Sequence, residues 1–331
     1  MKDEMSIEVI KPGLLTTIVS TRRDGVRYLG IGPTGAMDEF ALEVANFLVG
    51  NPVALATLEI HFPAPEILFH AAQLVSVAGV GFEVKVDDRT IPMWKPFVVS
   101  KGATLKFGKM PEGNRAYLST RGGWKAQAWL GSPTTHIGAQ IGGHAGRALQ
   151  KGDVLETNES EPCENEIKIL PWGISINELK KIYAPAGEIR CTESAETDML
   201  SRESNENLFS SSFAISPQSN RMGYRLEGEK LFPAKPIELV SSAVDFGTIQ
   251  LLPDGNLVIL MADHQTTGGY PRVASVIKPD LPKVAQRNLH DKIRFKLISL
   301  PEAELELEAR GRLMGELRNA CLSQCKRYLK V

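Results

Sequence analysis

Two short segments in the first half of the chain decide the fold class: Leu74-Val75-Ser76-Val77-Ala78 and Phe82-Glu83-Val84-Lys85-Val86. The first is mainly apolar, and the second alternates apolar with charged residues. Glycines separate the two segments. Short apolar or alternating runs bounded by Gly, Pro or Asp are typical of β-strands. These two segments therefore predict neighbouring strands.

The same pattern extends outward in both directions. Further segments of this kind in the first half are Ile7 to Ile10, Leu14 to Val19, Ala103 to Phe107 and Ala116 to Thr120. Those in the second half are Phe213 to Ser216, Gly247 to Leu252, Leu257 to Ala262, Val273 to Ile277 and Ile293 to Leu300. Many short strands with turn signals between them predict a mainly β protein, built as a sandwich or a barrel.

An acidic stretch divides the chain into two β-rich halves. Residues Glu156 to Glu166 lose the apolar periodicity and gain negative charge, as a solvated connection does. We therefore expect one domain over residues 1–160 and a second over residues 161–331, the second including a C-terminal helix.

Helices are expected to be few. Asp38 to Val49 places apolar residues on one face, carries acids in its first turn and stops at Gly50-Asn51-Pro52. Pro301 to Leu329 has apolar residues at four-residue spacing (Leu305, Ala309, Leu313 and Leu317), with Glu early and Lys or Arg late. Both segments are predicted helices.

Composition excludes several classes of protein. The 331 residues include 38 Lys and Arg against 39 Asp and Glu, a net charge of −1, so neither nucleic acid nor a membrane is an expected partner. No apolar run reaches the ~20 residues of a membrane span. Four scattered cysteines predict no disulfide framework, and six histidines lack the spacing of metal ligands. We expect a reduced, cytoplasmic protein without a metal site.

A glycine-rich stretch imitates a dinucleotide-binding fingerprint. Gly30-Ile31-Gly32-Pro33-Thr34-Gly35-Ala36 lies between the strand-like Val26 to Leu29 and the first predicted helix. However, Asp38 and Glu39 follow in the first helical turn, where a pyrophosphate would meet like charge. The chain also does not continue as alternating strands and helices. A glycine-rich turn leading into a capped helix is the favoured interpretation.

A dense polar loop offers the best candidate site. Asp263-His264-Gln265-Thr266-Thr267-Gly268-Gly269-Tyr270-Pro271-Arg272 places acid, imidazole, hydroxyl, phenol and guanidinium groups around a glycine pair. Backbone amides at such a pair can approach an anion. A decorated hairpin turn is the alternative. A second cluster, from Ser219 to Arg225, adds Arg221 and Arg225.

Several motifs together resemble a known family. The residues that carry the resemblance are Gly35-Ala36-Met37-Asp38, Ala45 to Asn51, Leu58-Glu59, Gly131-Ser132, Gly142-Gly143, Gly146-Arg147, Ser219 to Leu226, Gly247 to Gln250 and Asp263 to Arg272. They resemble the family of 5-oxoprolinase C subunits and biotin-dependent carboxyltransferase-like proteins, which includes proteins called allophanate hydrolase subunit 2 and the matching region of urea carboxylase. The resemblance implies two cyclophilin-like β-barrel domains with few helices.

The resemblance also implies a function. It predicts a subunit of an ATP-dependent 5-oxoprolinase, which with subunits A and B converts 5-oxo-L-proline to L-glutamate, the ATP site being shared with a partner subunit. The alternatives are a biotin-dependent carboxyltransferase, an allophanate- or urea-type amide enzyme subunit, and a non-catalytic regulator of the partner subunit. The amide substrate, the use of ATP or carboxybiotin and the oligomeric state are left open.

Roles for individual residues are our own inference from their chemistry. Guanidinium groups bind anions, while carboxyl and imidazole groups transfer protons. The expected catalytic residues are Asp263, His264 and Tyr270. The expected binding residues for substrate or nucleotide are Arg221, Arg225, Thr266, Thr267, Gly268, Gly269 and Arg272.

Overall fold

The structure is a computed structural model that describes residues 5–159, 166–183, 188–236 and 238–329. The chain forms two compact units. The first contains residues 1–23, 38–179 and 314–331, and the second contains residues 24–37 and 180–313. The boundary expected between residues 156 and 166 falls largely on residues 160–165, which lie outside the described residues, so the division at residue 160 stays a prediction.

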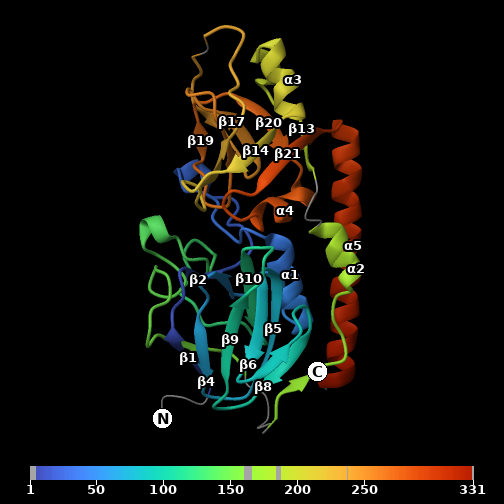
Figure 1. The fold of residues 1–331 in the computed structure, drawn as a ribbon. Coiled ribbons are helices and arrows are strands. Elements are labelled where there is room, and N and C mark those ends of the chain that lie inside the picture. The colour runs from blue at the N-terminus through green and yellow to red at the C-terminus, as the bar shows by residue number, and fades with distance from the viewer. Residues whose placement is uncertain (1–4, 160–165, 184–187, 237, 330–331) are drawn as a thin grey trace. The chain divides into compact units, whose positions relative to one another are not determined.

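The first unit is built from two antiparallel sheets (Figure 1). One sheet has the order β11 (Val154–Glu156), β1 (Ser6–Lys11), β4 (Glu66–Phe69), β9 (Thr104–Lys109), β6 (Phe82–Val86), β7 (Arg89–Ile91). The other has the order β12 (Lys168–Ile169), β8 (Pro96–Val99), β5 (Gln73–Val80), β10 (Arg115–Thr120), β3 (Thr57–His61), β2 (Thr16–Val19). Apolar side chains from both sheets form one core.

Burial follows the patterns of the two deciding segments. Strand β6 alternates buried and half-buried residues, because only one face of its sheet meets the core. Strand β5 is buried at every residue except the last. Its sheet packs on the core with one face, and helix α1 (Glu39–Leu48) covers the other, where the Ser76 hydroxyl donates to the Ala45 carbonyl at 2.6 Å (Figure 1).

Helix α1 begins and ends close to the predicted bounds. The Asp38 carboxylate accepts the backbone N–H of Ala41 at 3.0 Å, which is a standard N-cap. The chain leaves the helix through Gly50 at φ +78°. A Cβ at this glycine would lie 3.2 Å from the Cys325 sulfur, so close packing adds to the conformational reason for glycine.

The second unit contains a closed barrel of seven strands. Their order is β13 (Ile189–Thr192), β20 (Arg272–Val276), β17 (Thr248–Leu251), β18 (Leu257–Leu260), β15 (Gly223–Glu227), β14 (Ser212–Ile215), β21 (Lys292–Leu297). The neighbours are antiparallel except β13 and β21, whose parallel pairing closes the barrel. The prediction of a mainly β fold with barrel architecture is confirmed.

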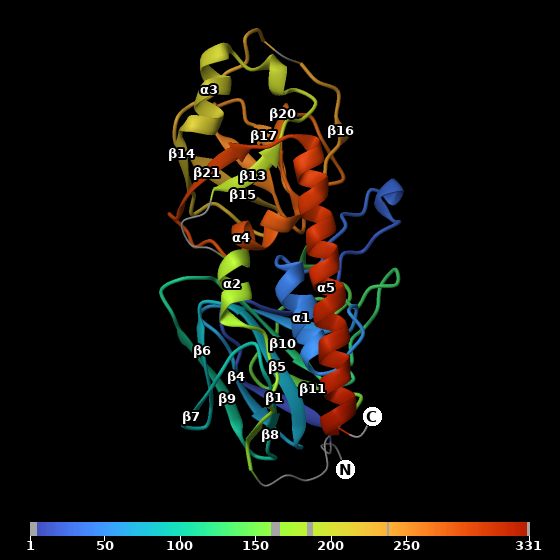
Figure 2. The ribbon, with the colours of Figure 1, turned by 90° about the vertical axis from the view of Figure 1, so that its right-hand side faces the viewer.

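Helices are short apart from the last one. They are α2 (Ile176–Ile182), α3 (Arg202–Ser210), α4 (Leu281–Ala285) and α5 (Leu300–Leu329), with 3-10 turns η1 (Arg27–Leu29), η2 (Ile137–Ala139), η3 (Thr197–Met199) and η4 (Lys278–Asp280). The long α5 in Figure 2 confirms the predicted C-terminal helix. The strand expected over residues 26–29 is wrong: Gly30, at φ +75°, donates to the Arg27 carbonyl and closes a 3-10 turn.

The two cysteines of α5 are packed thiols in the first unit. Cys321 and Cys325 are both buried, and the Cys325 sulfur donates to the Leu48 carbonyl at 3.8 Å. Burial raises the pKa of Cys321 to about 12. Such thiols are unreactive at neutral pH.

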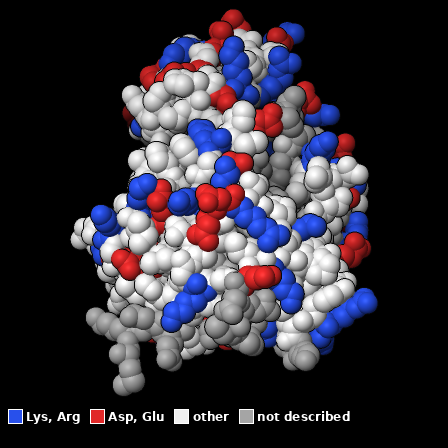
Figure 3. Space-filling view, turned by 60° about the horizontal axis from the view of Figure 1, so that its bottom comes forward, with Lys and Arg blue, Asp and Glu red and all other residues white. Residues whose placement is uncertain are grey.

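Charged side chains of both signs are interspersed on the face drawn in Figure 3, in keeping with the net charge of −1. Among the described residues, no helix is both long and apolar enough to cross a membrane. The same part of the chain holds no group of three or more His, Cys, Asp or Glu side chains placed to bind a metal ion.

Candidate functional site

The polar loop from Asp263 to Arg272 connects strands β18 and β20 of the barrel. Inside it, β19 (Thr267–Gly268) pairs with β16 (Ser242–Ala243) as a two-stranded ribbon. Gly268 packs closely against the barrel, since a Cβ there would lie 2.6 Å from the Gln250 amide nitrogen and would displace that side chain. That nitrogen donates to the Tyr270 carbonyl at 3.2 Å. The glycine therefore lets the loop fold back onto the barrel wall.

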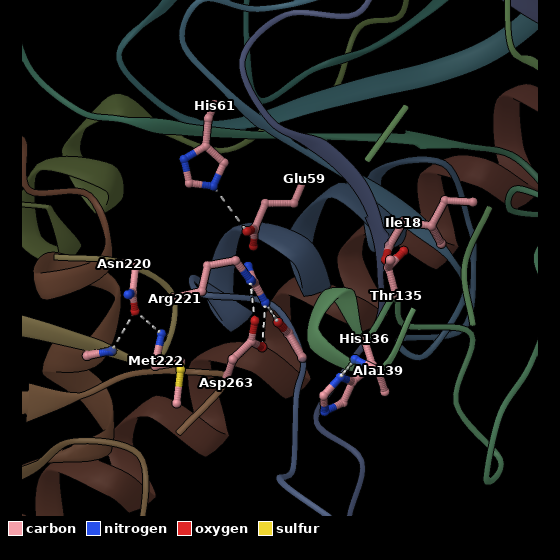
Figure 4. A network of polar contacts seen from close by, with 12 residues as sticks. Ile18, Glu59, His61, Thr135, His136, Ala139, Asn220, Arg221, Met222 and Asp263 are labelled. Atoms are coloured by element: carbon pink, nitrogen blue, oxygen red, sulfur yellow. Dashed lines mark hydrogen bonds and ion pairs between the residues drawn. The ribbon is translucent and has the colours of Figure 1, made fainter. Parts of the chain in front are cut away.

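Arg221 and Asp263 form a forked ion pair at the start of the loop (Figure 4). The Arg221 Nε and Nη2 atoms donate to the two carboxylate oxygens at 2.8 and 3.0 Å, and Nη2 also donates to the Gly35 carbonyl at 2.6 Å. Asn220 shapes the turn before β15 by accepting the backbone N–H of Met222 at 2.7 Å. The structure thus brings together two predicted site residues that are 42 positions apart in the sequence.

His264 is fully buried beneath the loop. Its Nδ1 donates to the Gln265 carbonyl at 2.6 Å, which leaves Nε2 facing the Asp245 carboxylate at 3.6 Å. Gly32 lies against the His264 backbone, where a Cβ would come within 2.8 Å of the carbonyl oxygen. The central glycine of the false dinucleotide fingerprint thus permits close packing of two chain segments.

Arg272 is held by a carboxylate that the sequence analysis missed. Its Nε and Nη2 donate to the two oxygens of Glu196 at 2.8 and 2.7 Å, and its backbone N–H donates to the same group at 2.9 Å. Its Nη1 donates to the Ala243 carbonyl at 3.1 Å. The hydrogen bond from Arg272 lowers the pKa of Glu196. No local motif marks Glu196, which lies 76 positions earlier in the sequence.

The remaining predicted residues differ in exposure. Thr267, Gly269 and Tyr270 are exposed, and the Thr266 carbonyl accepts the backbone N–H of Val244. Arg225 is exposed on β15, where its backbone N–H donates to the Ser219 hydroxyl at 3.0 Å. The loop therefore presents hydroxyl groups and a glycine backbone to solvent, while the Arg221 and Arg272 guanidinium groups are engaged by carboxylates.

Comparison with known proteins defines the class. Residues 29–297 match the family model described as "Carboxyltransferase domain, subdomain A and B". This chain belongs to that family, which confirms the resemblance seen in the sequence motifs.

Two bacterial relatives match over nearly their full length. The chain is 35% identical over 297 residues to the C subunit of 5-oxoprolinase from Haemophilus influenzae, covering 90% of this chain and 93% of that one. It is 34% identical over 300 residues to the C subunit of 5-oxoprolinase from Escherichia coli, with the same coverage. In both matches the two proteins correspond almost end to end.

A larger enzyme shares the fold. The crystal structure of Kluyveromyces lactis urea amidolyase superposes with a TM-score of 0.85 at 29% identity, covering 96% of this chain but 20% of that one. This chain therefore corresponds to about a fifth of that enzyme.

Proposed function

We propose that this chain is one subunit of an ATP-dependent 5-oxoprolinase that opens the lactam of 5-oxo-L-proline to give L-glutamate. The observation that carries the proposal is the near end-to-end match to two proteins named as the C subunit of 5-oxoprolinase. A lactam is a stabilised amide, so its opening gains from coupling to ATP hydrolysis. The proposal includes a cytoplasmic location.

The residues of this loop do not by themselves suit a triphosphate. A phosphate-binding site needs guanidinium groups or backbone amides aimed at the anion. Here Arg221 and Arg272 make forked pairs with Asp263 and Glu196, and Arg225 lies apart on β15. We therefore assign most of the ATP site to a partner subunit. Subunits A and B are the partners that the proposal names.

Within this chain, the loop from residue 263 to 272 is the proposed ligand-binding element. Thr266, Thr267 and Tyr270 would donate hydrogen bonds, and the backbone at Gly268 and Gly269 would approach an anionic group. Asp263 and His264 are the proposed proton-transfer groups, and Arg221, Arg225 and Arg272 the proposed anion-binding groups. Arg221 is paired with Asp263, and Arg272 is paired with Glu196. An anionic ligand would therefore have to compete with these carboxylates for the two guanidinium groups.

A carboxyltransferase is the second candidate. The family description and the superposition on urea amidolyase favour it. Such an enzyme would accept a carboxyl group from carboxybiotin and pass it to a urea-like amide. Its activity would require a biotinylated partner, and avidin would block it.

Purification of the chain with the partner that it retains, followed by an assay of glutamate release from 5-oxoproline, tests the proposal. The 5-oxoprolinase function predicts release that needs ATP and is insensitive to avidin. Inhibition by avidin would support the carboxyltransferase instead. A tight complex that shows neither activity, and that tolerates alanine at Asp263 and Arg272, would identify a regulator of the partner subunit.

A further inference from the structure

The first unit contains a pocket that the proposed function does not use. Its volume is about 480 Å³, and all of its lining residues belong to the first unit. They come from the turn between β6 and β7, the turn between β8 and β9 and the chain just before β12 (these β6 to β9 strands are labelled in Figure 2). Pockets that bind small molecules have volumes of roughly 300–1,000 Å³, so the size suits a small ligand.

Hydrogen bonds to neighbouring strands fix the two turns. Asp87 is held at φ +52°, a left-handed conformation that Asp tolerates. Its carboxylate accepts the backbone N–H of Thr104 at 2.9 Å, and its own N–H donates to the Thr104 carbonyl at 2.8 Å. Gly102, at φ +83°, donates to the Phe69 carbonyl at 2.7 Å, and a Cβ on it would meet no described atom within 4 Å. The turns are therefore rigid, and the space over Gly102 is open.

Four charged side chains line the pocket, two of each sign. The cations are Arg89 and Lys101, and the acids are Asp87 and Glu166. One guanidinium nitrogen of Arg89 donates to the Ile167 carbonyl at 2.9 Å, which ties the β7 edge to the chain before β12. Within the described part of the chain, no ion pair joins any two of these four groups. Charges of both signs are therefore available to a ligand.

Ser100 adds a polar group whose hydrogen bond is missing. It lines the pocket, and its carbonyl accepts the backbone N–H of Ala103 at 3.2 Å. Its hydroxyl oxygen is buried and has no hydrogen-bond partner among the described residues. A buried polar group without a partner is costly, so such a group calls for an explanation. A ligand that brings a polar group to the pocket provides one.

The balance of charges selects the ligand. A simple anion would meet the two carboxylates, and a simple cation would meet the two cations, so a molecule carrying both signs fits best. One Asp87 oxygen already accepts a backbone N–H, which leaves Glu166 as the freer acid. We propose that this pocket binds a small amino acid with an acidic side chain. Its two carboxylates pair with Arg89 and Lys101, and its ammonium group pairs with Glu166.

This site goes beyond the proposed function, because its residues take no part in opening the lactam. The choice of probe rests on that function, since L-glutamate is the product of the proposed reaction. L-Glutamate carries two carboxylates and one ammonium group at neutral pH. It therefore has the charges that the pocket selects.

The first test measures L-glutamate binding to the purified full-length chain by titration calorimetry. Lys101→Gln is compared with Lys106→Gln, which removes an equally exposed lysine of β9 that does not line the pocket. Lys101→Gln should weaken binding about 5-fold, the value of an exposed ion pair, and Lys106→Gln should bind like wild type. Both variants should melt like wild type. No binding by the wild-type chain at millimolar L-glutamate, or equal affinities of the two variants, would overturn the inference.

The second test uses glutarate, which has the two carboxylates of glutamate and no ammonium group. The wild-type chain should bind glutarate about 5-fold more weakly than L-glutamate, and Glu166→Gln should lose this preference. Equal binding of both ligands by wild type would reject an amino acid as the ligand. If the wild-type complex releases no glutamate from 5-oxoproline, the proposed function fails. These titrations need no turnover, so they still decide whether the pocket binds the amino acid.

Discussion

At the scale of single residues, Arg272 shows how a candidate binding group can also be a structural one. Its guanidinium and backbone N–H converge on Glu196, a side chain that is 10% exposed. Arg272→Lys keeps the charge but loses the planar fork, so we expect a stability loss of about 1–3 kcal/mol. Urea unfolding measures it, with Arg225→Lys on the exposed face of β15 as the control. Equal stability of the two variants would show that the fork contributes nothing to folding.

Asp153 gives a residue-scale prediction about pH. The forked hydrogen bonds from Arg147, at 2.6 and 2.8 Å, are the largest reason why the pKa of Asp153 is lowered to about 2. The unfolded chain binds this proton near pH 4 and the folded chain only near pH 2, so stability falls as the pH drops through this window. Asp153→Asn should flatten that part of the stability curve. The same acid dependence in both proteins would contradict this assignment.

The candidate site could be predicted in part from its residue types. The loop from residue 263 to 272 stands out because its polar groups exceed what a turn needs. The pairing of Asp263 with Arg221, and of Arg272 with Glu196, depends on neighbouring barrel strands and has no local signal. Similarly, Glu59 is visible as a motif residue, but the hydrogen bond that its carboxylate accepts from the Tyr117 hydroxyl follows only from the register of β3 and β10.

At the scale of elements, Asp280 joins three parts of the second unit. Its buried carboxylate accepts from Arg190 on β13 at 2.7 Å and lies 2.9 Å from the Lys283 amine on α4. Arg190 also pairs with Glu306 on α5 at 2.8 Å. Asp280→Ala leaves two cations without their shared partner, so we expect a loss of roughly 3 kcal/mol or more. Glu306→Gln, at a 45% exposed side chain, is the mild control in the same unfolding experiment.

Elements with strong periodicity were predictable, and short ones were not. Helix α1 has both a cap and an apolar face. Helix α5 was predictable from apolar residues at four-residue spacing between Leu305 and Leu317, although Leu305 itself is exposed. The two-residue strands β12, β16 and β19 are too short for any periodic pattern. The turn η1 was mistaken for a strand because its residues have strand-like side chains, while the backbone conformation of Gly30 decides the outcome.

At the scale of the whole molecule, local sequence patterns do not predict which segments of the chain belong to which compact unit. Residues 24–37 belong to the second unit, although segments of the first unit precede and follow them. Helix α5 likewise divides between the units at residues 313 and 314. Local patterns report secondary structure, but such assignments arise from contacts between distant residues.

Assembly with partner subunits is a second property of the whole molecule that can be tested. If most of the ATP site lies on a partner subunit, as proposed, this chain should be found in a stable complex with that partner. A tagged full-length chain, purified from its native host, is expected to retain partner subunits through gel filtration. The chain eluting alone and opening 5-oxoproline at the full rate would contradict the shared site.

The most direct test of the central claim is glutamate release by the purified complex, with ATP hydrolysis measured in the same reaction. We predict that glutamate forms only when ATP, 5-oxoproline and this chain are all present, and that avidin has no effect. Glutamate formation that continues without this chain, or a complete complex that forms none with ATP, would contradict the assignment as a 5-oxoprolinase subunit.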